Sequence, residues 1–213
     1  NRVVLSKYAY WFGNHFGPPE AREKGPDHIP RQVAFPFNPP DGMRLRIEHA
    51  QHLLAADIDR FGRLGVVASM QPLHKADDAR YAEKAIGPVR CRTSYAFRSL
   101  LHAGAHVAFG SDWPVSSHRP LDGLAVAVTR RNSRGEPIDG WLPEERMSIL
   151  HAIQAYTTGS AYQAFDDDAG ALRVGARSDL VVLDRDITAI SGDEVPDALV
   201  DETWVAGTAV FRR

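Results

Sequence analysis

The chain has 213 residues, of which 44% are hydrophobic and 24% charged, the balance of an ordinary globular protein. The formal net charge is −2 and no basic block stands out, so charge gives no case for a nucleic-acid partner or an anionic membrane surface. The single cysteine, Cys91, excludes an internal disulfide and a cysteine-clustered metal site, and no apolar run approaches the roughly 20 residues of a membrane span. Small molecules and proteins remain as partner classes.

Residues 1–42 are predicted to form a partial helix and a proline-rich loop. Residues 2–12 are apolar at enough positions for a buried helix, and no N-cap residue precedes them. The chain opens at Asn1 with neither a methionine nor a signal peptide, so we expect a cytoplasmic protein whose natural amino terminus is missing. Aromatic side chains such as Phe16 and Phe35 indicate that the loop packs on something, and a homodimer would supply that surface.

Residues 43–165 are predicted to alternate between strands and helices. Strands are expected at 43–47, 66–70 and 106–109, and helices at 53–64, 94–103 and 121–129. A polar loop is expected from His74 to Pro88. Further helices are expected from Pro143 onward, with Ser148 and Thr158 as N-caps. The alternation predicts a parallel sheet with right-handed crossovers, and therefore an α/β fold.

Residues 166–213 are predicted to be a small β element appended to that body. Apolar runs at 180–183, 203–205 and 208–211 are typical of strands, and Ala206-Gly207 predicts a tight turn between the last two. The expected organisation is therefore three segments, at 1–42, 43–165 and 166–213.

Each of the three predicted strands is followed by a polar side chain: His49, Gln71 and Asp112. If the strands are parallel neighbours, these side chains share one rim of the sheet. A neutral imidazole can bind a divalent metal, and a carboxylate can bind the same ion or accept a proton from water. A structural histidine and a turn-forming aspartate explain the same residues, and two ligands do not complete a zinc site.

Several segments together carry a family resemblance. They are RIEHAQ (46–51), ASMQP (68–72), YAFRSL (95–100) and FGSDWP (109–114), followed by AVTR (127–130), GW (140–141), AYT (155–157) and GARSDLVVLD (175–184). In order and approximate spacing they resemble the YtcJ-like branch of the amidohydrolase superfamily, from Met43 to the carboxyl terminus.

The resemblance implies the carboxyl-terminal part of a (β/α)8 TIM-like barrel with a small β-sandwich-type element. It implies hydrolysis of a small-molecule amide-type substrate, at a C–N bond other than a peptide bond, by water activated by zinc or another divalent metal. His49 matches the metal-binding histidine after the sixth barrel strand. Asp112 matches the aspartate after the eighth strand, a metal ligand that is also the catalytic proton carrier. The side chains expected to line the substrate pocket are Gln71, His74, Arg98 and Trp113.

The sequence departs from the family pattern in its first part. The family carries a His-x-His pair, a metal-bridging lysine and a further histidine on earlier strands, and no His-x-His occurs among the nine histidines here. Two hypotheses follow. The chain is a portion of a metal-dependent hydrolase and is inactive when isolated, or it is a truncated, non-catalytic remnant that serves as an interaction or oligomerisation module.

Overall fold

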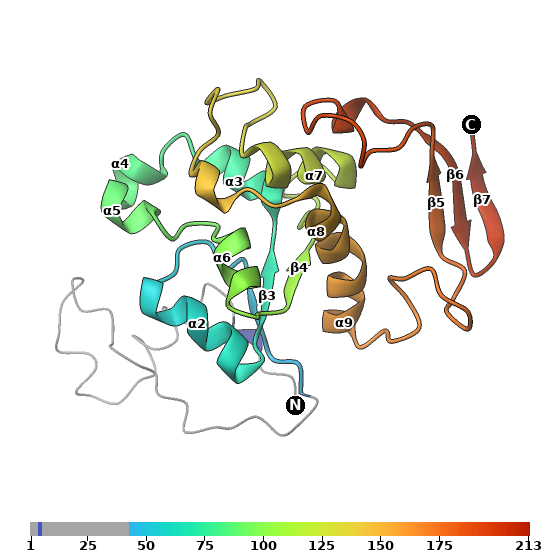
Figure 1. Ribbon diagram of the computed structural model, residues 1–213, viewed down its shortest axis with the longest axis horizontal. Helices are drawn as coiled ribbons and strands as arrows, with labels where there is room; N and C mark the ends of the chain where they lie inside the picture. The colour runs from blue at the N-terminus through green and yellow to red at the C-terminus, as the bar shows by residue number, and fades with distance from the viewer. Residues whose placement is uncertain (1–3, 6–42) are drawn as a thin grey trace.

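Four parallel strands form the main sheet of the molecule (Figure 1). They are β1 (Val4–Leu5), β2 (Arg46–Glu48), β3 (Val67–Met70) and β4 (Val107–Phe109), hydrogen-bonded in that order. All three neighbouring pairs are parallel, which confirms the predicted sheet type. This computed structural model describes residues 4–5 and 43–213.

β1 corrects the helix predicted for residues 2–12. Val4 pairs with Arg46 and Leu5 with Ile47, so these two residues belong to a strand. A β-branched residue beside a second apolar one suits extended backbone, and pairing with β2 decides what the local pattern leaves ambiguous. The proline-rich loop and its aromatic residues lie outside the described residues.

In the described part of the chain, five helices connect β2, β3 and β4. They are α2 (Ala55–Leu64), α3 (Pro72–Asp78), α4 (Ala82–Ile86), α5 (Pro88–Cys91) and α6 (Phe97–His102). α2 ends at Gly65 in the left-handed conformation that glycine adopts most readily. The polar loop predicted from His74 to Pro88 is wrong. Pro72 and Pro88 occupy first-turn positions, where the fixed φ of proline favours a helix start, so this stretch forms short helices.

Residues after β4 form a second group of helices. These are α7 (Pro120–Thr129), the 3-10 turn η2 (Pro143–Glu145), α8 (Ile149–Gln154), the π-turn η3 (Ala155–Gly159) and α9 (Ser160–Ala164). Ser148 caps α8 as predicted, because its side chain accepts a hydrogen bond from the backbone N–H of His151. Thr158 is not an N-cap: it lies inside η3 and donates to the Gln154 carbonyl at 3.1 Å.

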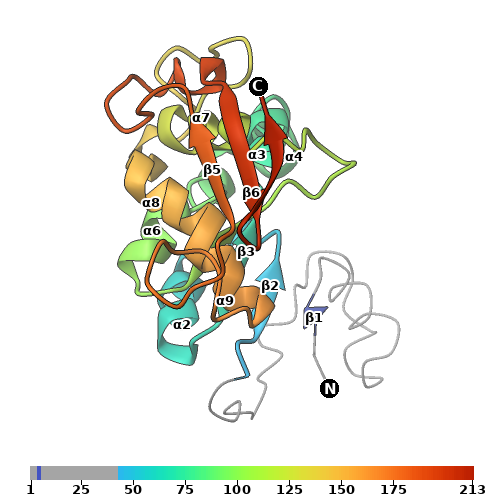
Figure 2. The same ribbon diagram turned by 90° about the vertical axis from the view of Figure 1, so that its right-hand side faces the viewer.

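The tail forms a separate antiparallel sheet beside α8 and α9 (Figures 1 and 2). Its strands are β5 (Leu180–Leu183), β6 (Val200–Val205) and β7 (Thr208–Arg212), in that order, and the short helix η4 (Val195–Asp197) precedes β6. The turn at Ala206-Gly207 has positive φ at both residues, which confirms the predicted hairpin.

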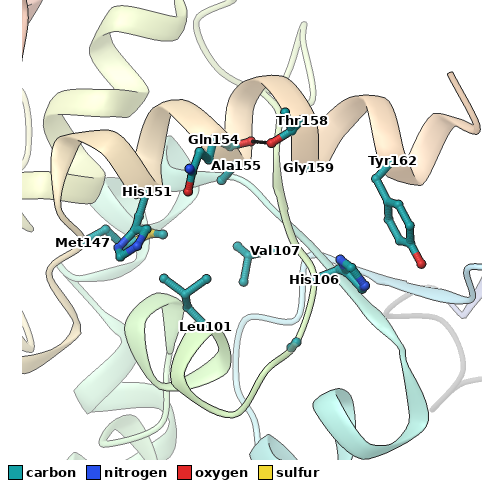
Figure 3. Close-up of a pocket in the computed structure, with 11 residues that line it drawn as sticks. Leu101, His106, Val107, Met147, His151, Gln154, Ala155, Thr158, Gly159 and Tyr162 are labelled. Carbon is teal, nitrogen blue, oxygen red and sulfur yellow. Dashed lines mark hydrogen bonds between the residues drawn. The ribbon is translucent and has the colours of Figure 1, made fainter. Parts of the chain in front are cut away.

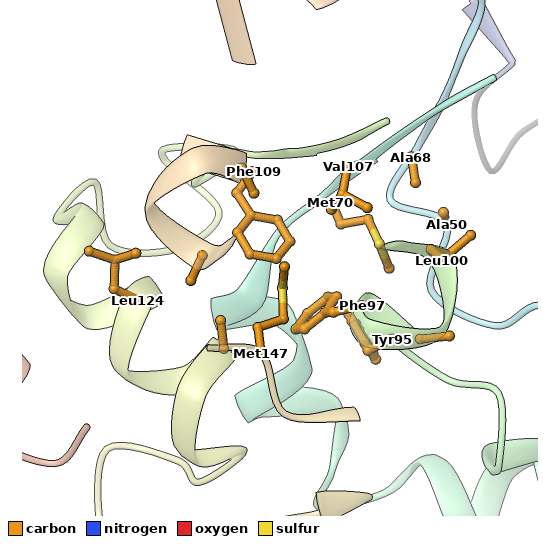
Figure 4. Packing of buried hydrophobic residues seen from close by; sticks show 14 of the residues in the cluster. Ala50, Ala68, Met70, Tyr95, Phe97, Leu100, Val107, Phe109, Leu124 and Met147 are labelled. Atoms are coloured by element: carbon orange, nitrogen blue, oxygen red, sulfur yellow. The ribbon is translucent and has the colours of Figure 1, made fainter. Parts of the chain in front are cut away.

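The hydrophobic core lies between the main sheet and its helices (Figure 4). Met70, Phe97, Leu100 and Phe109 are among its most buried members. The rings of Phe97 and Phe109 meet edge to face with 4.9 Å between centroids. Full burial of each such side chain stabilises the fold by about 1.5–3 kcal/mol. This packing fixes the strands whose carboxyl ends carry the polar residues.

Two cationic side chains are buried beside this core. Lys75 and Arg130 are both fully buried, and the Lys75 ammonium donates to the Arg130 carbonyl. The Arg130 guanidinium donates to the carbonyls of Trp141 and Tyr95 at 3.0 and 2.9 Å. Burial, with a smaller contribution from the positive charge of Arg130, lowers the pKa of Lys75 to about 7.

The helix formed by α8, η3 and α9 covers the outer edge of β4. The residues on either side, His106 and Gly110, make backbone hydrogen bonds to Ala68 and Met70 of β3. Because bonding alternates along a strand, the carbonyls of Val107 and Phe109 point away from β3. Ser160 Oγ donates to the Phe109 carbonyl at 2.7 Å, and a Cβ on Gly159 would lie 2.2 Å from the Val107 oxygen. Among the described residues, no helix combines the length and the apolar character needed to cross a membrane.

Candidate metal centre

Three potential ligands meet at the carboxyl ends of the parallel strands. His49 follows β2, His74 lies in the first turn of α3 just after β3, and Asp112 follows β4. One ligand atom from each lies within 4.8 Å of the others. His74 Nε2 is 3.8 Å from Asp112 Oδ2, and the two imidazole rings are stacked with 5.6 Å between centroids. The order of the strands therefore brings His49 and Asp112, the two predicted ligands, close together, and His74 lies beside them.

His49 is oriented by a neighbouring amide. Its Nδ1 lies 2.9 Å from Gln71 Oε1. An amide oxygen only accepts, so this contact fits an Nδ1–H tautomer, in which the Nε2 lone pair is available to a metal. Metal-ligating histidines generally donate their other ring N–H in this way, which fixes the tautomer and the ring orientation.

His74 supplies the observation that tests the fit of a metal. It is buried, and its Nε2 is a buried polar atom without a hydrogen-bond partner. Such atoms are rare, and an ion is one of the explanations for them. Burial lowers the pKa of His74, and the Asp112 carboxylate opposes that shift. The neutral, ligand-competent imidazole is thus favoured at neutral pH.

Asp112 lies on the open side of the cluster. Its side chain is 41% exposed, and the residue has a φ of 54°, in the left-handed region. Trp113, the next residue, is exposed on the same rim. Two imidazole nitrogens and one carboxylate oxygen are a ligand set typical of a catalytic zinc site, in which an open position remains. The donor set and the unpartnered nitrogen together fit a divalent metal.

Four of the six predicted site residues come together: His49, Gln71, His74 and Asp112. Arg98 points elsewhere, because its guanidinium contacts the Glu144 carbonyl at 3.5 Å. Gln71 is buried against His49, so it supports a candidate ligand.

Sequence reasoning missed a set of side chains behind the cluster. Gln51 Nε2 donates to the Tyr95 hydroxyl at 2.7 Å, and that hydroxyl donates to Asp78 Oδ2 at 2.5 Å. The sequence signal for them was the position of Gln51 and Tyr95 in two of the segments that carry the family resemblance, 46–51 and 95–100.

A cavity of about 340 Å³ lies away from the candidate metal centre, at the opposite end of β4 (Figure 3). Its lining includes His106, His151 and Tyr162. His106 is stacked on Tyr162 with 4.0 Å between ring centroids, and Thr158 donates to a backbone carbonyl. His106, Tyr162 and Thr158 thus have partners within the protein, and the cavity is not proposed as the site of chemistry.

Comparison with known proteins places the chain in a family. A profile of the Amidohydrolase family matches residues 15–211. The protein LONG AFTER FAR-RED 3 of Arabidopsis thaliana is 40% identical over 170 residues, which cover 79% of this chain and 29% of that protein. The putative amidohydrolase YtcJ of Bacillus subtilis is 29% identical over 206 residues, covering 91% of this chain and 39% of that protein.

A solved structure shares the fold. An uncharacterised metal-dependent hydrolase from Pyrococcus horikoshii superimposes with a TM-score of 0.63 at 28% identity, covering 71% of this chain and 31% of that one. The chain thus spans less than two fifths of the length of each of these relatives. The extent of the profile match and the shared α/β fold lead to one conclusion: the chain belongs to the amidohydrolase family, with YtcJ-like relatives.

Proposed function

We propose that the chain is a portion of a metal-dependent hydrolase that cleaves amide-type C–N bonds, other than peptide bonds, in a small-molecule substrate. The observation that carries this proposal is the approach of His49, His74 and Asp112 to within 4.8 Å, with the buried Nε2 of His74 left without a partner. Membership of the amidohydrolase family supports the reaction class.

Each residue has a distinct part in this proposal. His49 and His74 hold the metal through their free Nε2 atoms, and Gln71 keeps the His49 ring in the required tautomer. A bound divalent ion, zinc in our proposal, supplies Lewis acidity to a carbonyl and to water. Asp112, accessible on the open side, takes up a proton from the attacking water and returns it to the leaving nitrogen. Trp113 lies on the exposed rim, where it can contact substrate.

The architecture is proposed to be the last strands of a (β/α) barrel, with β5, β6 and β7 contributing to a small β-sandwich-type element. Two features support this. The main sheet is wholly parallel, with helical crossovers between its last three strands. The candidate ligands also follow the carboxyl ends of its strands, where barrel enzymes carry their chemistry.

Metal binding by the purified chain tests the proposal. We expect one Co²⁺ or Zn²⁺ per chain, bound at micromolar metal and lost in His49→Ala, His74→Ala and Asp112→Asn. His102→Ala removes an exposed histidine of α6 and serves as the matched control, with occupancy unchanged. Amine release from small N-acyl and formamide compounds tests the reaction class in the whole protein, because we expect the isolated portion to be inactive. A chain that folds but binds no metal at this supply would instead favour the non-catalytic interaction module.

A further inference from the structure

Tyr95 makes hydrogen bonds to residues near both candidate histidine ligands. It is fully buried, and its hydroxyl accepts from Gln51 Nε2 at 2.7 Å and donates to Asp78 Oδ2 at 2.5 Å. Its backbone N–H also donates to the Gln51 carbonyl at 2.7 Å. One residue therefore makes hydrogen bonds to the loop that follows β2 and to helix α3, which follows β3.

Gln51 connects Tyr95 to His49. It lies two residues after His49, and the turn between them has φ values of 69° at His49 and 41° at Ala50. L-residues adopt such angles only where the surroundings hold them there. Tyr95 holds Gln51 through both its backbone and its side chain, so it fixes the far end of this unfavourable turn.

Asp78 connects Tyr95 to His74. Asp78 is the last residue of α3 and lies four residues after His74, on the same helix face. Its second carboxylate oxygen accepts from the Tyr81 hydroxyl. The hydrogen bond from Tyr95 therefore holds the end of the helix whose first turn carries His74.

Tyr95 is also held in place by contacts that do not involve its hydroxyl. The Tyr95 carbonyl accepts from the buried Arg130 guanidinium at 2.9 Å. Its ring meets Phe97 and Trp141 edge to face, with centroids 6.1 and 6.4 Å away. A phenylalanine at this position would keep these contacts and lose only the two bonds to Gln51 and Asp78.

We propose that Tyr95 is a positioning residue whose hydroxyl sets the separation and mutual orientation of the His49 and His74 imidazoles. The inference rests on the proposed metal centre. The two rings lie within 18° of parallel. Without the shared hydroxyl, the His49 turn and α3 lose their common hydrogen-bond partner, and their nitrogens are no longer held at a fixed spacing.

Tyr95→Phe tests this in the full chain, with Co²⁺ as the probe. We expect Co²⁺ affinity to fall on the order of tenfold, as is typical when support of a metal ligand is removed, and the visible absorption of the bound Co²⁺ to change. The matched control is Ser99→Ala, which removes a hydroxyl that donates to the buried Glu145 carboxylate, away from the cluster. This control is expected to lower the urea midpoint while leaving the Co²⁺ affinity and spectrum unchanged.

A second readout needs no metal. In ¹⁵N–¹H spectra of the histidine rings of the metal-free chain, Tyr95→Phe is expected to shift the ring resonances of His49 and His74, because the two rings are no longer held at a fixed spacing. If the wild-type chain binds no Co²⁺, the metal centre fails while the ring spectra still decide the role of Tyr95. Wild-type ring spectra in Tyr95→Phe, together with Co²⁺ affinity within twofold wherever the wild type binds, would overturn the inference.

Discussion

Replacing Lys75 by methionine is expected to change stability with a sign that depends on pH. The folded chain holds this lysine fully buried, and its pKa falls from 10.5 to about 7 because of burial and the charge of Arg130. Below pH 7 both the folded and the unfolded chain carry the charge, and the folded state bears its desolvation. Between pH 7 and 10.5 the unfolded chain binds more protons, so wild-type stability rises with pH in that window.

The magnitude follows from the pKa difference. A fall from 10.5 to about 7 corresponds to about 5 kcal/mol of destabilisation at and below pH 7, as an upper bound. Methionine removes the cost of burying the Lys75 charge. It also removes the hydrogen bond to the Arg130 carbonyl, which is a loss of about 1–2 kcal/mol. The Arg130 carbonyl still accepts a hydrogen bond from the backbone N–H of Trp141 at 2.9 Å. The variant should therefore be more stable by about 3 kcal/mol near pH 6, and less stable by about 1 kcal/mol near pH 10.

Urea unfolding of the metal-free chain, followed by tryptophan fluorescence at pH 6, 8 and 10, measures this effect. Lys84→Met, at an exposed lysine of α4, is the matched control and should change the free energy of unfolding by less than about 0.5 kcal/mol at each pH. A Lys75→Met variant that is destabilised equally at all three pH values would refute the reasoning. It would mean that the folded protein solvates the Lys75 charge well.

Gly159→Ala should destabilise the fold by about 3 kcal/mol or more, because the new Cβ would lie 2.2 Å from a backbone oxygen of β4. Gly110→Ala, where a Cβ meets nothing within 4 Å, is the control, and equal melting temperatures of the two variants would contradict the predicted clash. Ser148→Ala should cost about 1 kcal/mol through loss of the α8 N-cap, with Ser148→Thr retaining stability in the same melting assay. In the metal-free chain, the lowered pKa of His74 means that the unfolded state takes up its proton first as pH falls below 6.5, so stability declines there. His74→Gln should flatten that decline in urea titrations between pH 7 and 5, and an unchanged profile would be evidence against the burial of a neutral His74.

The fold was predictable where one local signal dominated. The strands at 67–70 and 107–109 are short apolar runs, fully buried, and α2 stops at Gly65 as its sequence indicates. The prediction failed between Pro72 and Cys91. The many charged residues there suggested a loop, but the stretch forms three short helices, two of which begin at a proline. It also failed at Val4–Leu5, because a two-residue strand is defined by its partner.

The residues of the candidate site that directly follow strands could be predicted from the sequence. His49 and Asp112 follow strands directly, so their proximity follows from a parallel sheet. His74 was expected only to line a substrate pocket, because its approach depends on α3 turning back at Pro72. The Tyr95 hydrogen bonds join residues 17 and 44 positions apart in the chain, and no local pattern encodes such pairs.

The covered edge of β4 has a consequence for assembly. A strand adding to this edge would need the carbonyls of Val107 and Phe109, but Gly159 packs closely against the first and Ser160 donates a hydrogen bond to the second. Neighbouring strands lie about 4.8 Å apart, so the α8–α9 stretch would have to shift by about that distance and release the Ser160 hydrogen bond. Pairing of any further strand with β4 at this edge therefore requires the helix to undock first.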